Sequence, residues 1–151
     1  MTPLQKRVAV AQAAVDRFNG KPFAWGTADC RALASFVLRE FGWKPPKGGA
    51  YRTALGAKKA LAKAGYADLS EALDALGLPR IPPAAALPGD ILRLEDAHGF
   101  GALTVALGNG RVLTFGGGVG AIGQPFMGQP RRDDGTFGRE PIAWCVEVRN
   151  G

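Results

Sequence analysis

Apolar residues recur at helical spacing along the first part of the chain. Within residues 3–18 they fall three or four positions apart, which predicts a helix that buries one face. The residues of this stripe are Leu4, Val8, Ala11, Val15 and Phe18. Pro3 suits the first turn of such a helix, and Asn19-Gly20 suits its end.

A second apolar stripe begins at Cys30 and predicts a helix that stops at Phe41-Gly42. Its inward positions are Leu33, Ala34, Val37, Leu38 and Phe41. Either Thr27 or Asp29 can cap the start of this helix with a side-chain oxygen. Both alternatives place Cys30 in the first turn, where unpaired backbone N–H groups and the helix dipole favour a thiolate over a thiol.

Two more helices are predicted before any strand. The first covers residues 51–63 and ends at Gly65. Its inward residues are Tyr51, Ala54, Leu55, Leu61 and Ala62. The second follows Asp68, which together with Glu71 resembles a capping box, and it ends at Gly77. Its inward residues are Leu69, Leu73 and Leu76.

After Pro79 the pattern changes from helical to strand-like. Strands are predicted from Gly89-Asp90 to about residue 94, over 101–107, over 111–115 and over 142–148. Gly108-Asn109-Gly110 joins the second and third of them, because Asn-Gly supplies the positive φ angles of a tight hairpin. Helices followed by an antiparallel sheet predict an α+β domain, with the N-terminal helices packed on the sheet.

Residues 116–140 are rich in glycine and yet carry several large apolar side chains. These are Val119, Ile122, Phe126, Met127 and Phe137. So long a loop is uncommon inside a compact domain and usually belongs to a functional flap or to a segment ordered by a partner. We therefore expect a partner surface here, with a short strand at residues 119–122 as the alternative.

Composition narrows the class of protein. The 151 residues are 46% hydrophobic, which predicts one domain over residues 1–151 with a proper core. The sequence contains no apolar run of 18 residues, so we expect no membrane span. Its N-terminal segment is charged and helical rather than a secretory signal, which indicates a protein that is made and assembled in a cytoplasm.

The net charge of +6 is spread along the chain without a nucleic-acid-binding motif, so we expect no nucleic-acid partner and rank such a function last. Two cysteines and one histidine offer no metal-ligand spacing. The glycine run at 116–120 is followed by neither a helix nor a Lys-Ser/Thr pair, which argues against a phosphate cradle. We expect no metal and no cofactor.

Three short motifs stand in a particular order. The first is Phe23-Ala24-Trp25-Gly26-Thr27-Ala28-Asp29-Cys30, the second is Gly89-Asp90-Ile91-Leu92, and the third is Leu107-Gly108-Asn109-Gly110. Together they resemble the NlpC-type cell-wall cysteine peptidases, a branch of the papain-like fold. The resemblance covers residues 22–115 and implies an NlpC-type α+β domain.

The resemblance also implies site residues. Cys30 takes the place of the nucleophile, and His98 is the one histidine available as its base. The family's own histidine position corresponds to Ala102, and its orienting group corresponds to Thr114. A tyrosine that often precedes the nucleophile is replaced by Phe23. Cys145 lies in an alternating strand and is expected in the core.

The closest likeness is to small versions of this domain in tailed phages and gene-transfer particles. This implies a tail-tip protein of the virion, assembled in the bacterial cytoplasm beside other tail-tip subunits. Two functions remain open. One is a cysteine peptidase or amidase that cuts peptidoglycan peptides with Cys30 and His98. The other is a catalytically inactive structural adaptor that uses the same fold and docks through residues 116–140.

Overall fold

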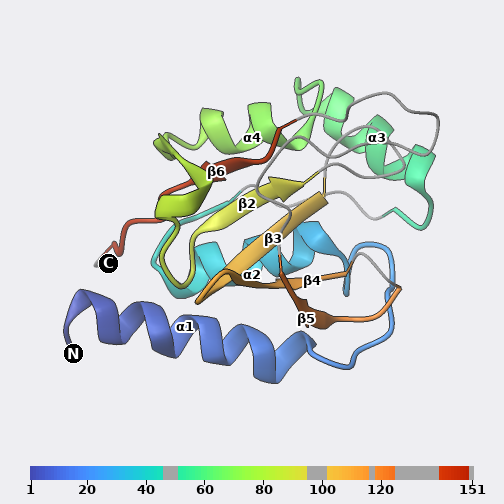
Figure 1. The fold of residues 1–151 in the computed structure, drawn as a ribbon. Coiled ribbons are helices and arrows are strands. Elements are labelled where there is room, and N and C mark those ends of the chain that lie inside the picture. The colour runs from blue at the N-terminus through green and yellow to red at the C-terminus, as the bar shows by residue number, and fades with distance from the viewer. Residues whose placement is uncertain (46–50, 95–101, 116–117, 125–139, 150–151) are drawn as a thin grey trace.

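Four helices precede most of the sheet in the computed structural model, which describes residues 1–45, 51–94, 102–115, 118–124 and 140–149 (Figure 1). The helices are α1 (Pro3–Phe18), α2 (Cys30–Glu40), α3 (Ala54–Lys63) and α4 (Leu69–Ala75), with a short 3₁₀ helix, η1, at Pro83–Ala85. The strands are β1 (Arg80–Ile81), β2 (Ile91–Leu94), β3 (Ala102–Gly108), β4 (Arg111–Thr114), β5 (Ala121–Gly123) and β6 (Ile142–Trp144).

The strands form a six-stranded sheet in the order β1-β6-β2-β3-β4-β5, in which every neighbouring pair is antiparallel. The C-terminal strand β6 lies between β1 and β2, so the chain returns to the middle of the sheet at its end. At the β3–β4 hairpin, Asn109 has a φ of 55° and Gly110 a φ of 72°, as the Asn-Gly turn predicts. The predicted α+β class is therefore confirmed.

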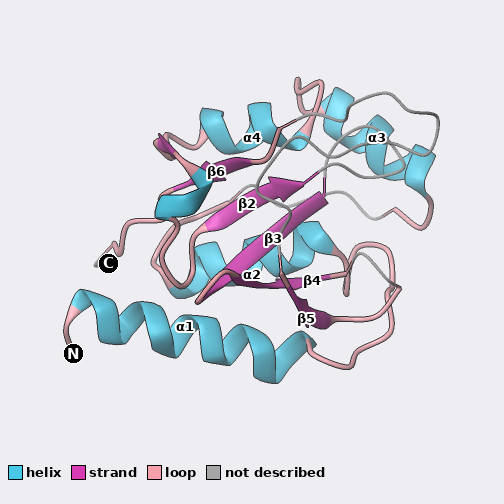
Figure 2. Cartoon of the chain, viewed as in Figure 1, coloured by secondary structure: helices cyan, strands magenta, loops and turns pink. Residues whose placement is uncertain are grey.

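The main core lies between the sheet and the helices (Figure 2). Helix α2 packs on β3, and α1 packs on both α2 and β3. All five residues of the predicted α2 stripe are buried, and Leu69 and Leu73 of α4 join the same core. Across the described ranges, no helix is long and apolar enough to cross a lipid bilayer.

Helix α1 has the predicted bounds but buries a different face. Leu4 and Val8, expected inside, are 56% and 53% exposed, whereas Arg7, Val10 and Ala14 are buried. The predicted stripe is therefore wrong over the first two turns. The reason is Arg7. Its guanidinium binds a buried carboxylate, so the face of the helix that carries Arg7 packs against the interior.

The partner of Arg7 is Asp90, the second residue of the Gly89-Asp90 motif. The guanidinium of Arg7 donates to Asp90 Oδ1 at 2.8 Å, to the Pro88 carbonyl at 3.1 Å and to the Val146 carbonyl at 2.8 Å. Asp90 in turn accepts from the backbone N–H of Val146 and of Leu87. One buried ion pair thus joins α1, the start of β2 and the chain beyond β6.

Gly89 is required by both its backbone and its surroundings. Its φ of +90° is unfavourable for any residue with a Cβ, and a Cβ placed there would overlap the ring of Phe41. Phe41 is the C-cap residue of α2 and is fully buried. The Gly89-Asp90 motif therefore lets the strand pass directly beneath the end of α2.

Several boundaries differ from the sequence-based predictions. Helix α3 begins three residues later than expected and has no buried residue, so Leu55, at 62% exposure, and Ala62 were wrongly assigned to its inward face. Strand β6 is shorter than predicted, and β1 was missed because a two-residue strand has no periodicity to detect. Cys145 is only partly buried, since it follows the last residue of β6.

The short strand weighed as an alternative for residues 119–122 exists as β5, one or two residues further along. It pairs with β4, and Val119 forms a bridge with Pro22. Residues 125–139 of the glycine-rich segment lie outside the described residues, so the expected partner surface stays a prediction there.

Replacement of Gly89 by alanine tests the close approach to Phe41. We expect Gly89→Ala to lower the free energy of unfolding by roughly 2–5 kcal/mol, because backbone strain and overlap with the ring add together. Gly77→Ala is the matched control: its φ is +89° and nothing lies within 4 Å of the added Cβ, so it should cost only about 1–2 kcal/mol. Urea denaturation measures both, and equal losses would contradict the predicted overlap.

A double-mutant cycle on Arg7 and Asp90 tests the buried pair. Arg7→Met leaves a buried carboxylate without its counter-charge and should cost about 3–5 kcal/mol of stability. In the Arg7→Met, Asp90→Asn double variant that charge is gone, so we expect part of the loss to be recovered, with a coupling energy of about 1–3 kcal/mol. Additive losses in chemical denaturation would show that the two side chains act independently.

Candidate functional site

The start of α2 is held by the carboxylate of Asp29. Asp29 is the N-cap, and its Oδ1 accepts from the backbone N–H of Ala32 at 2.8 Å. Its Oδ2 accepts from the backbone N–H of Gly26, also at 2.8 Å. Of the two predicted caps, Asp29 is therefore correct, and the side chain of Thr27 stays exposed. The carboxylate itself is buried, with Asp29 only 2% exposed.

Cys30 is the first residue of α2 and is partly buried against the main core. Helical spacing puts it on the same face as Leu33, Ala34 and Val37, which is the face that packs toward β3. Neither Cys30 nor Cys145 forms a disulfide. The prediction that Cys30 lies in the first turn of a helix is confirmed.

Tyr51 connects the chain before α3 to the start of α2. Its hydroxyl donates to Asp29 Oδ2 at 2.9 Å and accepts from Arg31 Nε at 2.7 Å. Arg31 also donates to the Gly26 carbonyl at 3.2 Å. Burial, together with the nearby Asp29 carboxylate, raises the pKa of Tyr51 to about 12 despite the opposing effect of Arg31. The phenol is therefore neutral and keeps its proton on the Asp29 side.

Three aromatic rings pack around this network. Trp25 lies edge-on to Phe23, with ring centroids 4.7 Å apart, and to Tyr51, at 6.1 Å. Phe23 also contacts Phe115, which directly follows the last residue of β4. The position expected for a family tyrosine thus holds Phe23, while a tyrosine hydroxyl reaches the same region from Tyr51.

Of the three sequence positions considered as a base or orienting group for Cys30, the structure describes Ala102 and Thr114 but not His98. His98 lies outside the described residues, so its role as a base stays a prediction. Ala102, which stands at the family's histidine position, is the first residue of β3 and carries a methyl group that cannot accept a proton. Thr114, at the position of the orienting group, is the last residue of β4.

Both carboxylate oxygens of Asp29 accept hydrogen bonds that hold the local structure. Its two oxygens accept three hydrogen bonds, from Ala32, Gly26 and Tyr51, so it is a cap and an anchor rather than a base for Cys30. In the ranges that the structure describes, no group of three histidine, cysteine or acidic side chains could hold a metal ion.

Sequence reasoning missed Tyr51 and Arg31. Tyr51 was predicted on the inward face of a helix, but that helix begins only at Ala54. Arg31 was not predicted as a site residue, because it lies outside the apolar stripe of α2. One available signal was Thr53, which caps α3 by accepting from Gly56 and so places Tyr51 outside the helix.

Solved structures with the same fold are NlpC/p60 domains. RipD from Mycobacterium tuberculosis, described as a non-catalytic NlpC/p60 domain protein with an adaptation to peptidoglycan binding, matches with a TM-score of 0.52 and 18% identity over 93% of this chain and 97% of RipD. The P60 domain of antigen MAP1272c from M. avium paratuberculosis matches with a TM-score of 0.52 and 18% identity, over 97% of this chain and 96% of that domain. NlpC2 from Trichomonas vaginalis gives 0.52 and 16% over 93% of this chain and 47% of its own. The fold is therefore NlpC-type.

The chain belongs to the family described as Domain of unknown function (DUF6950), whose model matches residues 3–124. This match includes the α2 start, the Gly89-Asp90 motif and the β3–β4 hairpin. No curated protein matches the sequence.

Tyr51→Phe tests whether the phenol anchors the site. The variant keeps the ring contact with Trp25 but removes the hydrogen bonds to Asp29 and from Arg31, so we expect it to lose about 1–2 kcal/mol of stability. Tyr66→Phe is the control, because no hydrogen bond or ring contact is recorded for that side chain in the described part of the chain. Thermal and urea unfolding measure the difference; equal small effects would mean that the Tyr51 hydroxyl contributes nothing.

Proposed function

We propose that this protein is a phage tail-tip subunit that binds peptidoglycan stem peptides at the start of α2 and does not cut them. The single observation that supports this is that the start of α2 has the residues of the resembled motif, while the strand position expected to supply the catalytic base holds a residue that cannot act as one. Asp29, Cys30 and the Gly89-Asp90 motif are in place, whereas the strand residue that would supply the base is Ala102.

Ala102 carries no group that could accept the Cys30 proton, so attack by the sulfur would need a base from another part of the chain. The region around Cys30 still suits binding. Trp25 and Tyr51 offer aromatic surface near the start of α2, where Tyr51 bonds the cap residue Asp29, and Arg31 links Tyr51 to the Gly26 backbone. A short peptide can pack on such rings without any chemistry taking place.

RipD supports the binding alternative by analogy. Its description combines an NlpC/p60 domain without catalysis and an adaptation to peptidoglycan binding. At 18% identity this likeness concerns the fold, and its extension to ligand binding is our proposal. The tail-tip location, in the virion and beside other tail subunits, rests on the resemblance of the sequence motifs to small phage versions of the domain. Residues 116–140 would then form the surface for those subunits.

A second candidate function is hydrolysis of a peptidoglycan peptide amide. It is favoured by Cys30 as the first residue of α2, where unpaired backbone N–H groups stabilise negative charge. In this reaction the Cys30 sulfur attacks the amide carbon while His98 takes the thiol proton and passes it to the leaving amine. Water then hydrolyses the thioester, and backbone N–H groups near Cys30 hold the oxyanion.

Titration with a purified disaccharide-tetrapeptide distinguishes the two functions. We expect saturable binding to wild-type protein and to Cys30→Ala with similar affinity, and no new product in chromatography after long incubation. Trp25→Ala should weaken binding at least fivefold, because it removes the aromatic surface that packs on Tyr51 near the start of α2, while Tyr66→Ala beyond the end of α3 should not.

Cleavage of the peptide, or a lack of binding, would contradict the proposed function. Cleavage by the wild-type protein that disappears in both Cys30→Ala and His98→Ala would replace the binding proposal with the hydrolase. Absence of both binding and cleavage would reject a peptidoglycan role. If deletion of residues 125–139 leaves the fold intact but prevents incorporation into tails, the adaptor surface is supported; normal incorporation would contradict it.

A further inference from the structure

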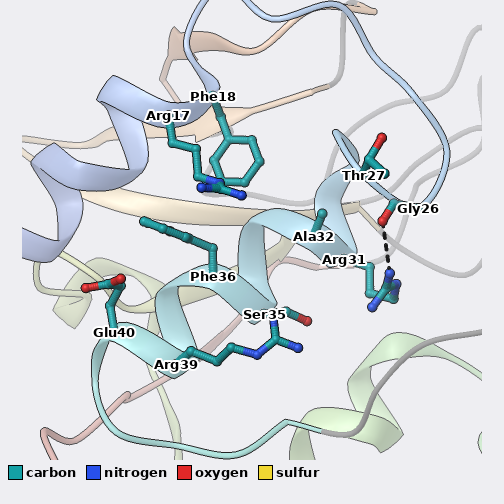
Figure 3. A pocket seen from close by; sticks show the side chains of 10 residues that line it. All are labelled: Arg17, Phe18, Gly26, Thr27, Arg31, Ala32, Ser35, Phe36, Arg39 and Glu40. Carbon is teal, nitrogen blue, oxygen red and sulfur yellow. Dashed lines mark hydrogen bonds between the residues drawn. The ribbon is translucent and has the colours of Figure 1, made fainter.

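A basic cavity lies on the side of α2 that faces away from the sheet. Its volume is about 540 Å³, within the range of small-molecule sites. Three arginines line it, Arg17 from the end of α1 and Arg31 and Arg39 from α2, against a single carboxylate, Glu40 (Figure 3). The lining of this half-open cavity therefore carries excess positive charge.

Two of the three guanidinium groups are held in place before any ligand arrives. Arg17 lies over the rings of Phe18 and Phe36, at 5.7 and 5.2 Å from their centroids. Arg31 is fixed by its bonds to the Tyr51 hydroxyl and the Gly26 carbonyl. Stacking on a ring leaves the N–H groups at the edge of Arg17 able to donate. Preorganised donors reduce the entropy lost on binding.

The floor of the cavity combines polar and apolar groups. Figure 3 shows Ser35 and Ala32 on α2 between the arginines, with the ring of Phe36 beside Arg17. A hydroxyl next to guanidinium groups suits an anionic head, and the ring suits an organic part attached to it. These are the elements of a small-ligand site rather than of a solvated charged face.

This cavity adjoins the start of α2, since Gly26 lines it and Tyr51 holds Arg31, but its α2 arginines lie on a different face of the helix from Cys30. Arg31, Ser35 and Arg39 follow each other at four-residue spacing on the outer face of α2, whereas Cys30 shares the inner face with Ala34 and Val37. These two arginines and the Cys30 thiol therefore lie on different faces of one helix. Ligand binding in this cavity therefore does not depend on whether Cys30 reacts.

We propose that this cavity binds the phosphate or diphosphate group of a small molecule. Guanidinium groups match phosphate oxygens with two parallel hydrogen bonds. Three arginines opposed by one glutamate balance a group that carries two or more negative charges better than they balance a single carboxylate. The organic part of the ligand would contact Phe36.

Inorganic pyrophosphate is the probe, titrated at low salt because exposed charges are screened at higher ionic strength. We expect saturable binding with amide shifts in NMR spectra confined to residues 17–18 and 26–40. Arg17→Gln combined with Arg39→Gln should weaken binding at least tenfold. The matched control, Lys58→Gln with Lys59→Gln on exposed α3 positions, removes the same charge and should change affinity less than twofold.

Three results would overturn the proposal: no saturable binding of pyrophosphate, equal losses in the two double variants, or succinate binding as tightly as pyrophosphate. Thermal unfolding of both double variants checks that the fold is unchanged, and Arg39→Gln alone, on an exposed side chain, repeats the test if the double variant unfolds. ADP and glycerol 3-phosphate as further ligands distinguish a nucleotide from a polyol phosphate, according to which of them binds more tightly than pyrophosphate.

Discussion

The ion pair between Arg7 and Asp90 is the interaction on which the arrangement of helices and sheet depends. Burying two charges is costly, and their attraction offsets that cost only where the remaining polar atoms also find partners. Here they do, because backbone carbonyls of Pro88 and Val146 accept from the guanidinium and backbone N–H groups donate to the carboxylate. The pair therefore specifies one position for α1 against the start of β2 and against the final segment of the chain.

This constraint reaches the candidate site through α2. The strand that carries Asp90 passes under Phe41, where only glycine at position 89 leaves room, so the C-terminal end of α2 is fixed against the sheet. The other end is fixed by Asp29 and Tyr51. With both ends held, a rigid helix presents Cys30 on one face and an arginine-lined cavity on another. The geometry of both sites thus follows from packing contacts that lie outside them.

The features that were predictable from the sequence are those set by interactions between residues close together in the chain. Asp29 as a helix cap and Asn109 in a hairpin act through atoms only a few positions away, and the α2 stripe is a periodic signal. The parts that were missed depend on distant residues. Arg7 is buried because Asp90 lies 83 positions later, and Tyr51 belongs to the site because Asp29 lies 22 positions earlier. No local pattern carries such information, so charged and aromatic side chains were placed by propensity alone.

The Asp29-Cys30 pair at the start of α2 can be explained by the fold without reference to activity. In this protein the aspartate is explained completely by structure, since it caps the helix, holds the Gly26 turn and anchors Tyr51. None of these roles requires a reactive thiol, so the presence of the aspartate does not by itself indicate catalysis. The identity of the residue at the start of β3, rather than the presence of the cysteine motif, is therefore the informative position. Because that residue is Ala102, the sequence motif alone supports the NlpC-type fold, and a reaction would have to come from a histidine placed elsewhere.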